Sequence, residues 1–180
     1  MRHNSTFKIV VTALFAALIC VATMLFPIAI PATGGYANLG DGIILLSAFL
    51  MHPLCATAAA GLGSMLADIL AGYMTFAPGT LIIKGGVALI AALIYNRFDR
   101  NRSGRAGFAM LLVAAIAGEV FMVLGYFCYE AIFLGYGMGA VAAIPGNLGQ
   151  AAVGIIVASV LTPVLTRSHE LSEMMDKTRR

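Results

Sequence analysis

The feature that most limits the fold of this chain is a series of long apolar stretches that contain almost no charged residues. A stretch of about 20 mostly apolar residues is enough to span a lipid bilayer as a helix. The 180 residues are 61% hydrophobic and only 11% charged, whereas soluble domains contain roughly 25% charged residues. The sequence therefore predicts an integral membrane protein, and its length predicts a single domain.

Prolines, glycine-rich turns and charged segments divide the chain into six apolar segments, and we expect a helix in each of them. The predicted fold class is an all-α integral membrane protein with a six-transmembrane-helix bundle. The predicted helices comprise about residues 6–26, 39–51, 54–72, 78–98, 107–133 and 147–164. Segments 27–38 and 135–147 contain several prolines or glycines, so we expect loops there.

The second predicted helix is too short to cross the membrane alone. A helix of about 13 residues covers roughly 20 Å, whereas the hydrocarbon core is about 30 Å thick. Backbone outside a helix is tolerated at this depth only where it is buried in protein or faces water. We therefore expect either that segment 27–38 dips into the bundle or that the membrane thins there, and the segment is a candidate lining for a cavity. We interpret Asp41, near the start of this helix, as its N-cap.

The basic residues predict the orientation of the bundle. Apart from Lys84, they lie near the start of the first helix, around the loop after the fourth helix and after the sixth helix. These residues are Arg2, Lys8, Arg97, Arg100, Arg102, Arg105, Arg167, Lys177, Arg179 and Arg180. The positive-inside rule then places both termini in the cytoplasm. Because this topology accounts for the net charge of +3, the charge indicates no nucleic-acid partner.

Four ionisable residues within the predicted helices are candidates for a functional role, namely Asp68, Lys84, Glu119 and Glu130. Ionisable groups are costly inside a bilayer and by default indicate a functional site. Tyr126 recurs with the two glutamates at helical spacing, so the three residues are predicted to share one face of the fifth helix.

Near the outer end of the bundle, these groups predict a site for a small polar molecule that enters from outside. The predicted substrate-binding residues are Tyr36, Asp68, Lys84, Glu119, Tyr126, Glu130, Asn147 and Gln150. A second interpretation is that Lys84 only pairs with Asp68 or a glutamate to neutralise a buried charge, or extends toward the outer surface. Tyr36 and Tyr73 either stack on a planar ligand ring or belong to an interfacial tyrosine belt.

The sequence contains none of the motifs expected of a metalloprotease, a serine hydrolase or a P-loop ATPase. The cysteines lack paired spacing and are interpreted as packing residues, so we expect no disulfide, no metal and no cofactor. We therefore predict that the chain is not an enzyme. On the first helix, Ala13 and Ala17 form a pair of small residues that lets another helix approach closely. That helix belongs either to this bundle or to a partner.

Three apolar motifs carry a resemblance to a known family. The segments LGDGIILLSAFL, GLGSMLADILAGY and APGTLIIKGGVALIAALI lie between Leu39 and Ile94. They resemble the substrate-capture (S) components of energy-coupling factor (ECF) vitamin transporters. The similarity is strongest to the branch assigned to pyridoxine or hydroxymethylpyrimidine, which is related to the riboflavin S components.

This resemblance implies a protein of the prokaryotic cytoplasmic membrane that binds a vitamin or vitamin precursor near the outer face. It implies docking on a transmembrane coupling (T) subunit that sits on two ATPases, with outward loops acting as gates. Ala13 and Ala17 match the Ala-xxx-Ala docking pattern of the family. The absence of tryptophan departs from the thiamine type. Alternative functions are a riboflavin S component, a small oligomeric transporter that works alone, or a structural membrane protein whose buried charges only pair.

Overall fold

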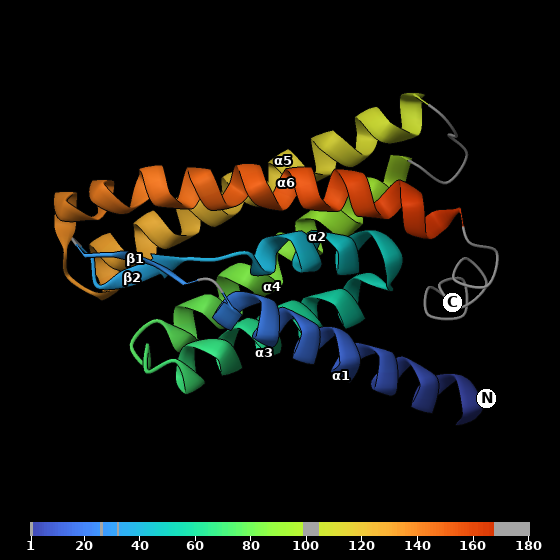
Figure 1. The fold of residues 1–180 in the computed structure, drawn as a ribbon, viewed down its shortest axis with the longest axis horizontal. Coiled ribbons are helices and arrows are strands. Elements are labelled where there is room, and N and C mark those ends of the chain that lie inside the picture. Colours follow the sequence, from blue (N-terminus) through green and yellow to red (C-terminus); the bar gives the residue numbers. More distant parts are fainter. Residues whose placement is uncertain (1, 26, 32, 99–104, 168–180) are drawn as a thin grey trace.

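The computed structural model describes residues 2–25, 27–31, 33–98 and 105–167 and consists of a helical bundle with one small hairpin (Figure 1). The elements in chain order are α1 (Arg2–Leu25), β1 (Ile28–Ile30), β2 (Gly35–Ala37), α2 (Gly40–Leu50), α3 (Pro53–Leu70), α4 (Ala77–Phe98), α5 (Arg105–Cys128), a π-helical turn (Tyr129–Phe133), a 3₁₀ helix (Gly137–Ala143) and α6 (Ile144–Thr166).

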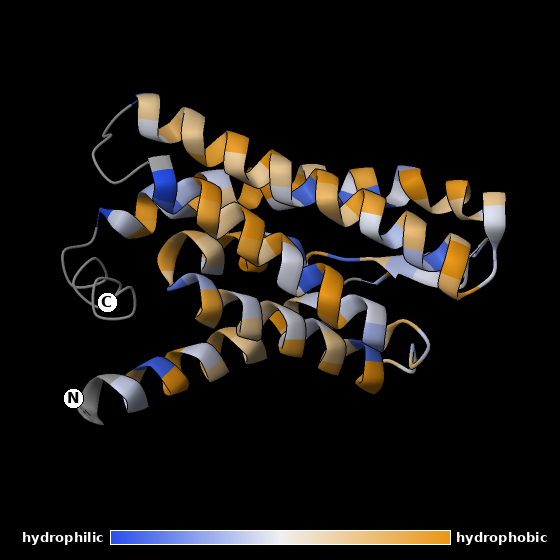
Figure 2. Cartoon of the chain, turned by 180° about the vertical axis from the view of Figure 1, so that it is seen from behind, coloured by the Kyte–Doolittle hydropathy of each residue, from blue (hydrophilic) through white to orange (hydrophobic). Residues whose placement is uncertain are grey.

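Most of these helices are suited to a membrane. In the described part of the chain, five helical segments are long and apolar enough to cross a bilayer, and α2 is not among them. Apolar residues extend along the full length of the long helices (Figure 2), and many large ones are exposed on the surface of the bundle. The described residues thus form six α-helices, of which five have the length of a span, and the number of six spans stays a prediction.

Helix α2 lies at the centre of the bundle. It is only 11 residues long, and all of them except Ile43 are buried. It packs against α1, α3, α4 and α6. The contact with α6 is close enough to require glycine. A Cβ atom at Gly42 would lie 2.6 Å from Val157 Cγ1, and one at Gly154 would lie 2.9 Å from Asp41 Cβ. An apolar sequence on every side of a helix is typical of this buried position.

The segment before α2 enters the bundle, as expected from the short length of α2. It is a two-stranded antiparallel hairpin and not the expected loop, with Ile28 opposite Ala37. Gly34 makes the turn with a φ angle of 67°, which a residue without a side chain adopts readily. Ala37 and Asn38, where the hairpin meets α2, are 5% and 7% exposed.

The second predicted loop, 135–147, is largely helical. A 3₁₀ helix occupies Gly137–Ala143, and α6 begins directly after it at Ile144, three residues earlier than predicted. The glycines of this segment are the reason that the sequence indicates a loop. Pro145 is compatible with the helix, because proline is favoured in the first turn, where no hydrogen bond from its nitrogen is needed.

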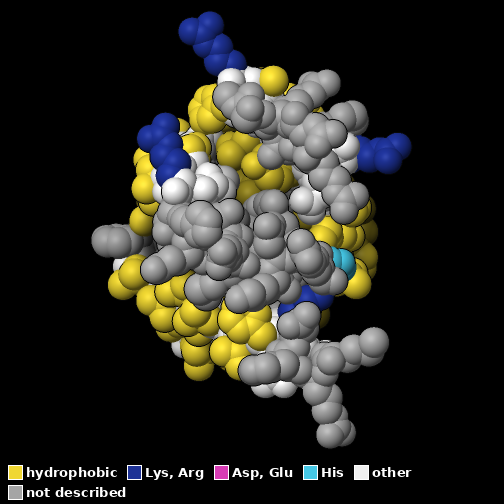
Figure 3. Space-filling view, turned by 90° about the vertical axis from the view of Figure 1, so that its right-hand side faces the viewer, with side chains coloured by type: hydrophobic (Ala, Val, Ile, Leu, Met, Phe, Trp, Pro, Cys, Tyr) yellow, Lys and Arg dark blue, Asp and Glu magenta, His cyan; other side chains and the backbone are white. Residues whose placement is uncertain are grey.

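The two ends of the bundle differ. The start of α1, the end of α4, the start of α5 and the end of α6 lie at one end, and the hairpin lies at the other (Figure 1). Lys and Arg side chains surround the first end (Figure 3), where Lys8, Arg97, Arg105 and Arg167 belong to these helix termini. Residues 99–104 and 168–180, with Arg100, Arg102 and the basic tail, lie outside the described residues. The cytoplasmic location of this end stays a prediction.

We expect the α1–α3 contact to be intolerant of a single methyl group. A Cβ atom at Gly63 would lie 2.5 Å from the backbone oxygen of Ala16, whereas one at Gly149 on α6 would have no heavy atom within 4 Å. Gly63→Ala should lower the free energy of unfolding by about 1–3 kcal/mol, as overpacking does. Gly149→Ala should leave it unchanged or raise it, because alanine favours the helix by roughly 1 kcal/mol. Thermal unfolding of both purified variants in detergent measures the difference, and equal behaviour would contradict this packing.

Candidate functional site

A cavity lies at the hairpin end of the bundle and is bounded by the hairpin and parts of α1, α3, α4, α5 and α6. It is lined by aromatic, hydroxyl, amide and charged side chains. The lining residues are Thr23, Ile30, Gly35, Tyr36, Asn38, Ser64, Asp68, Phe76, Thr80, Lys84, Tyr126, Glu130, Asn147 and Gln150. Polar groups from the hairpin and from several helices converge on this space, as the orienting groups of a small-molecule site do.

A buried ion pair lies at one wall of this cavity, with Lys84 in the lining and Asp41 outside it. Lys84 Nζ lies 2.5 Å from Asp41 Oδ1, and the two side chains are 2% and 0% exposed. Gln150 Nε2 donates a hydrogen bond of 2.6 Å to the second carboxylate oxygen, Asp41 Oδ2. Both oxygens of the carboxylate are therefore paired, as a buried charge requires.

The interpretation of Asp41 as an N-cap is wrong. The N-cap residue of α2 is Leu39, which makes no side-chain cap, and Asn38 Oδ1 instead accepts a hydrogen bond of 2.9 Å from the Gly40 nitrogen. Asp41 lies in the first turn of α2, where the positive end of the helix dipole favours a carboxylate. The partner of Lys84 is therefore Asp41, and neither Asp68 nor a glutamate.

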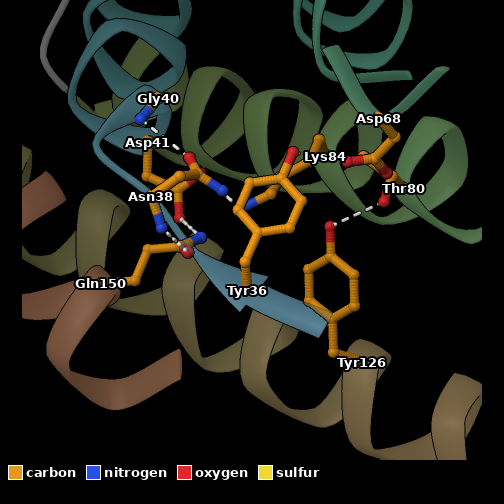
Figure 4. A network of polar contacts seen from close by, with 9 residues as sticks. All are labelled: Tyr36, Asn38, Gly40, Asp41, Asp68, Thr80, Lys84, Tyr126 and Gln150. Carbon is orange, nitrogen blue, oxygen red and sulfur yellow. Dashed lines mark hydrogen bonds and ion pairs between the residues drawn. The ribbon is translucent and has the colours of Figure 1, made fainter. Parts of the chain in front are cut away.

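The same network reaches the hairpin. The Asn38 nitrogen donates a hydrogen bond of 2.7 Å to Gln150 Oε1. Gln150 thus binds the end of the hairpin with its oxygen and Asp41 with its nitrogen (Figure 4). One continuous set of polar contacts joins the hairpin, α2, α4 and α6.

Tyr36 connects the hairpin to α3. Its hydroxyl donates a hydrogen bond of 2.6 Å to Asp68 Oδ1, and its ring lies 4.4 Å from the ring of Tyr73, measured between centroids. Burial, together with the neighbouring Asp68, raises the pKa of Tyr36 well above its ordinary value, so the phenol stays protonated and remains a donor.

Tyr126 and Thr80 complete the polar wall between α4 and α5. Their hydroxyl oxygens lie 2.9 Å apart, and Lys84 Nζ lies 5.4 Å from the centre of the Tyr126 ring. This distance is within the range of a cation–π interaction between the ammonium group and the ring. Tyr126 therefore contributes both an apolar ring face and a polar group to the cavity (Figure 4).

The two glutamates of the fifth segment lie in different places. Glu130 lines the cavity and belongs to the π-helical turn, a feature frequent at functional sites. Glu119 is not among the lining residues, although it is only 2% exposed. A Cβ atom at Gly154 would lie 3.3 Å from Glu119 Oε1 and 2.9 Å from Asp41 Cβ, so Glu119 and Asp41 both lie against the same point of α6.

The structure thus places seven of the eight predicted binding residues around one cavity, and Glu119 outside it. Ala13 and Ala17 are exposed on α1, whereas Ala16 contacts α3 at Gly63. The sequence analysis missed Asn38, Asp41 and Thr80. For Asp41 a signal exists, because a carboxylate in a short helix that is apolar on every side needs a buried cation as its partner.

Comparisons with known proteins agree with the resemblance. A sequence model of the family described as "ECF-type riboflavin transporter, S component" matches residues 3–167. A Pyrococcus woesei protein described as "uncharacterized protein in gap 3′ region" is 38% identical over 149 residues, which cover 83% of this chain and 95% of the relative. The "thiamine precursor transporter HmpT" of Lactococcus lactis subsp. cremoris is 29% identical over 169 residues, or 93% of each chain. The chain belongs to the ECF-type riboflavin transporter S-component family.

Proposed function

We propose that this protein is the substrate-binding S component of an ECF transporter that captures a small vitamin or vitamin precursor at the outer face of the membrane. Pyridoxine and hydroxymethylpyrimidine are the favoured ligands. A transmembrane T subunit and two ATPases then drive uptake. The observation that carries this proposal is the cavity at the hairpin end, whose polar groups converge inside an apolar bundle.

The lining of the cavity suits a small aromatic ring with polar substituents. Tyr36, Phe76 and Tyr126 offer aromatic faces, and Lys84, Asn147 and Gln150 offer groups that can form hydrogen bonds. A relative described as a thiamine precursor transporter supports a small precursor as the ligand. The family description supports riboflavin as the second candidate.

The hairpin is suited to act as a gate. On the cavity side, two hydrogen bonds hold it in place. The Tyr36 hydroxyl donates to Asp68, and at the end of the hairpin the Asn38 nitrogen donates to Gln150. Both contacts are single hydrogen bonds, each worth about 1–3 kcal/mol. Movement of the hairpin away from α3 and α6 would therefore open the cavity without unfolding a transmembrane helix.

Helix α1 offers a surface for the T subunit. Ala13 and Ala17 are exposed on it and take no part in the close contact that Ala16 makes with α3. Small residues on an exposed helix face allow the backbone of a partner helix to approach closely in lipid. We assign this pair to docking.

The first test is binding across a vitamin panel. We expect pyridoxine or hydroxymethylpyrimidine to raise the melting temperature of the purified protein, since a ligand at about 100 times its Kd stabilises by roughly 2.7 kcal/mol. Native mass spectrometry of the protein as purified should show a retained small aromatic molecule. No retained ligand and no shift with pyridoxine, hydroxymethylpyrimidine or riboflavin would contradict the proposal.

The second test separates binding from a structural role of the ion pair. Lys84→Met alone leaves Asp41 buried without its cation and should lower stability by about 3–5 kcal/mol. Adding Asp41→Asn removes the second charge and keeps an oxygen for Gln150, so stability should largely return. Ligand affinity should not return with stability. The double variant should bind ligand at least about tenfold more weakly than the wild-type protein, because Lys84 lines the cavity. Wild-type affinity in the folded double variant would assign the pair to structure alone.

The third test concerns docking. Ala13→Phe or Ala17→Phe should abolish uptake by the complete transporter in proteoliposomes and leave ligand affinity within about twofold, because a bulky side chain blocks close helix contact. Ala152→Phe places the same ring on the exposed surface of α6 and should retain uptake. Loss of ligand binding together with uptake would indicate a folding role for the alanines. Uptake by the protein without any coupling module would instead support a transporter that works alone.

A further inference from the structure

We propose that the ligand of this cavity is a basic nitrogen heterocycle that carries an amino group or a protonated ring nitrogen. Glu130 is the residue that selects it. This inference rests on the proposed function and specifies the ligand class of the same site. It concerns a carboxylate to which the comparisons assign no role.

The charges around the cavity do not balance. Among the described residues that line it, three are charged, namely Asp68, Lys84 and Glu130. The ammonium of Lys84 is already paired with Asp41, which lies behind it and outside the lining. Two carboxyl groups therefore face the cavity, and no unpaired Lys or Arg belongs to the described lining.

Of the two carboxyl groups in the lining, Glu130 needs a partner more than Asp68 does. It is 3% exposed, and its Oε2 atom is buried without a hydrogen-bond partner. Asp68 has one oxygen bound by Tyr36, and only its Oδ2 atom lacks a partner. A buried polar atom without a partner is unfavourable, and more so when it is charged. A ligand that donates hydrogen bonds to Glu130 would remove this cost.

Other lining groups favour the same ligand chemistry. The hydroxyls of Thr23 and Ser64 are also buried without partners, and they can donate or accept. An amino group beside a protonated ring nitrogen gives a carboxylate two parallel hydrogen bonds and a positive charge, and such bidentate charged pairs are strong. The aromatic faces of Tyr36 and Tyr126 suit the flat ring that carries these groups.

The same charge balance excludes anionic ligands. A phosphate ester would bring a charge of about −1.5 to −2 at pH 7 next to two carboxyl groups, and the only described cation of the lining is already paired. A carbonyl oxygen in place of the amino group would bring a hydrogen-bond acceptor against the Glu130 carboxylate, which is also an acceptor. We therefore expect the free amino heterocycle to bind, and its phosphate ester and its oxo analogue to be rejected.

The test compares matched ligands on the full-length protein by isothermal titration calorimetry. The probes are 4-amino-5-hydroxymethyl-2-methylpyrimidine, its 4-oxo counterpart and its phosphate ester. Wild-type protein should bind the amino compound about 10- to 100-fold more tightly than the oxo compound, and the ester should show no binding. Glu130→Gln should reduce the preference for the amino compound to less than about threefold.

Glu119→Gln provides a matched control for the charge. It removes a buried carboxyl group from the same segment at a position outside the cavity lining, so the preference for the amino compound should remain. Because the comparison of the three ligands on wild-type protein needs no variant, it decides the matter even if Glu130→Gln does not fold.

Two results would overturn the inference and leave the proposed function standing. One is tighter binding of riboflavin or of the oxo compound than of any amino or basic heterocycle, and the other is an unchanged preference in folded Glu130→Gln. If none of these compounds and no vitamin of the panel binds, the inference and the proposed function fail together.

Discussion

The interaction on which the rest of the structure depends is the buried ion pair between Lys84 and Asp41. Two charges inside an apolar bundle are tolerated only when they are close and their remaining atoms are satisfied. The pair meets both conditions, since it measures 2.5 Å and Gln150 binds the second carboxylate oxygen. It fixes the central helix α2 to α4 and α6, and through the Asn38–Gln150 contact it also fixes the end of the hairpin. The shape of the cavity follows from this network.

The pair also determines the sign of charge in the cavity. In the sequence, Lys84 is the natural anchor for an anionic group of a ligand, because it lies inside a predicted helix and away from the basic residues at the helix ends. In the structure its charge is neutralised from behind by Asp41, and the carboxyl groups of Asp68 and Glu130 remain. The same set of ionisable residues therefore favours opposite ligands, depending on which carboxylate the lysine binds.

The sequence predicted the membrane class, the helices and most of the cavity lining, because these follow from hydropathy, from helix breakers and from the cost of buried polar groups. It also indicated segment 27–38 as a candidate to enter the bundle, since the second helix is short. What it could not predict is distance between helices. Helical spacing placed Glu119 and Glu130 on one face, but they differ in depth, and Glu119 lies against α6 beside Asp41. Asp41 has the residue type and position of an N-cap, and only tertiary packing identifies its partner.

Helix α1 links the two proposed activities of the protein. Of its small residues, Ala16 is used for packing against α3, which leaves Ala13 and Ala17 on the exposed face. On the same helix, Thr23 lines the cavity. Ala17 and Thr23 are six residues apart, which corresponds to roughly 9 Å along a helix. Because a helix is stiff over this length, a partner that tilts or shifts α1 through the alanine face also moves one wall of the cavity, so the proposed docking and ligand release would be mechanically connected without any further element.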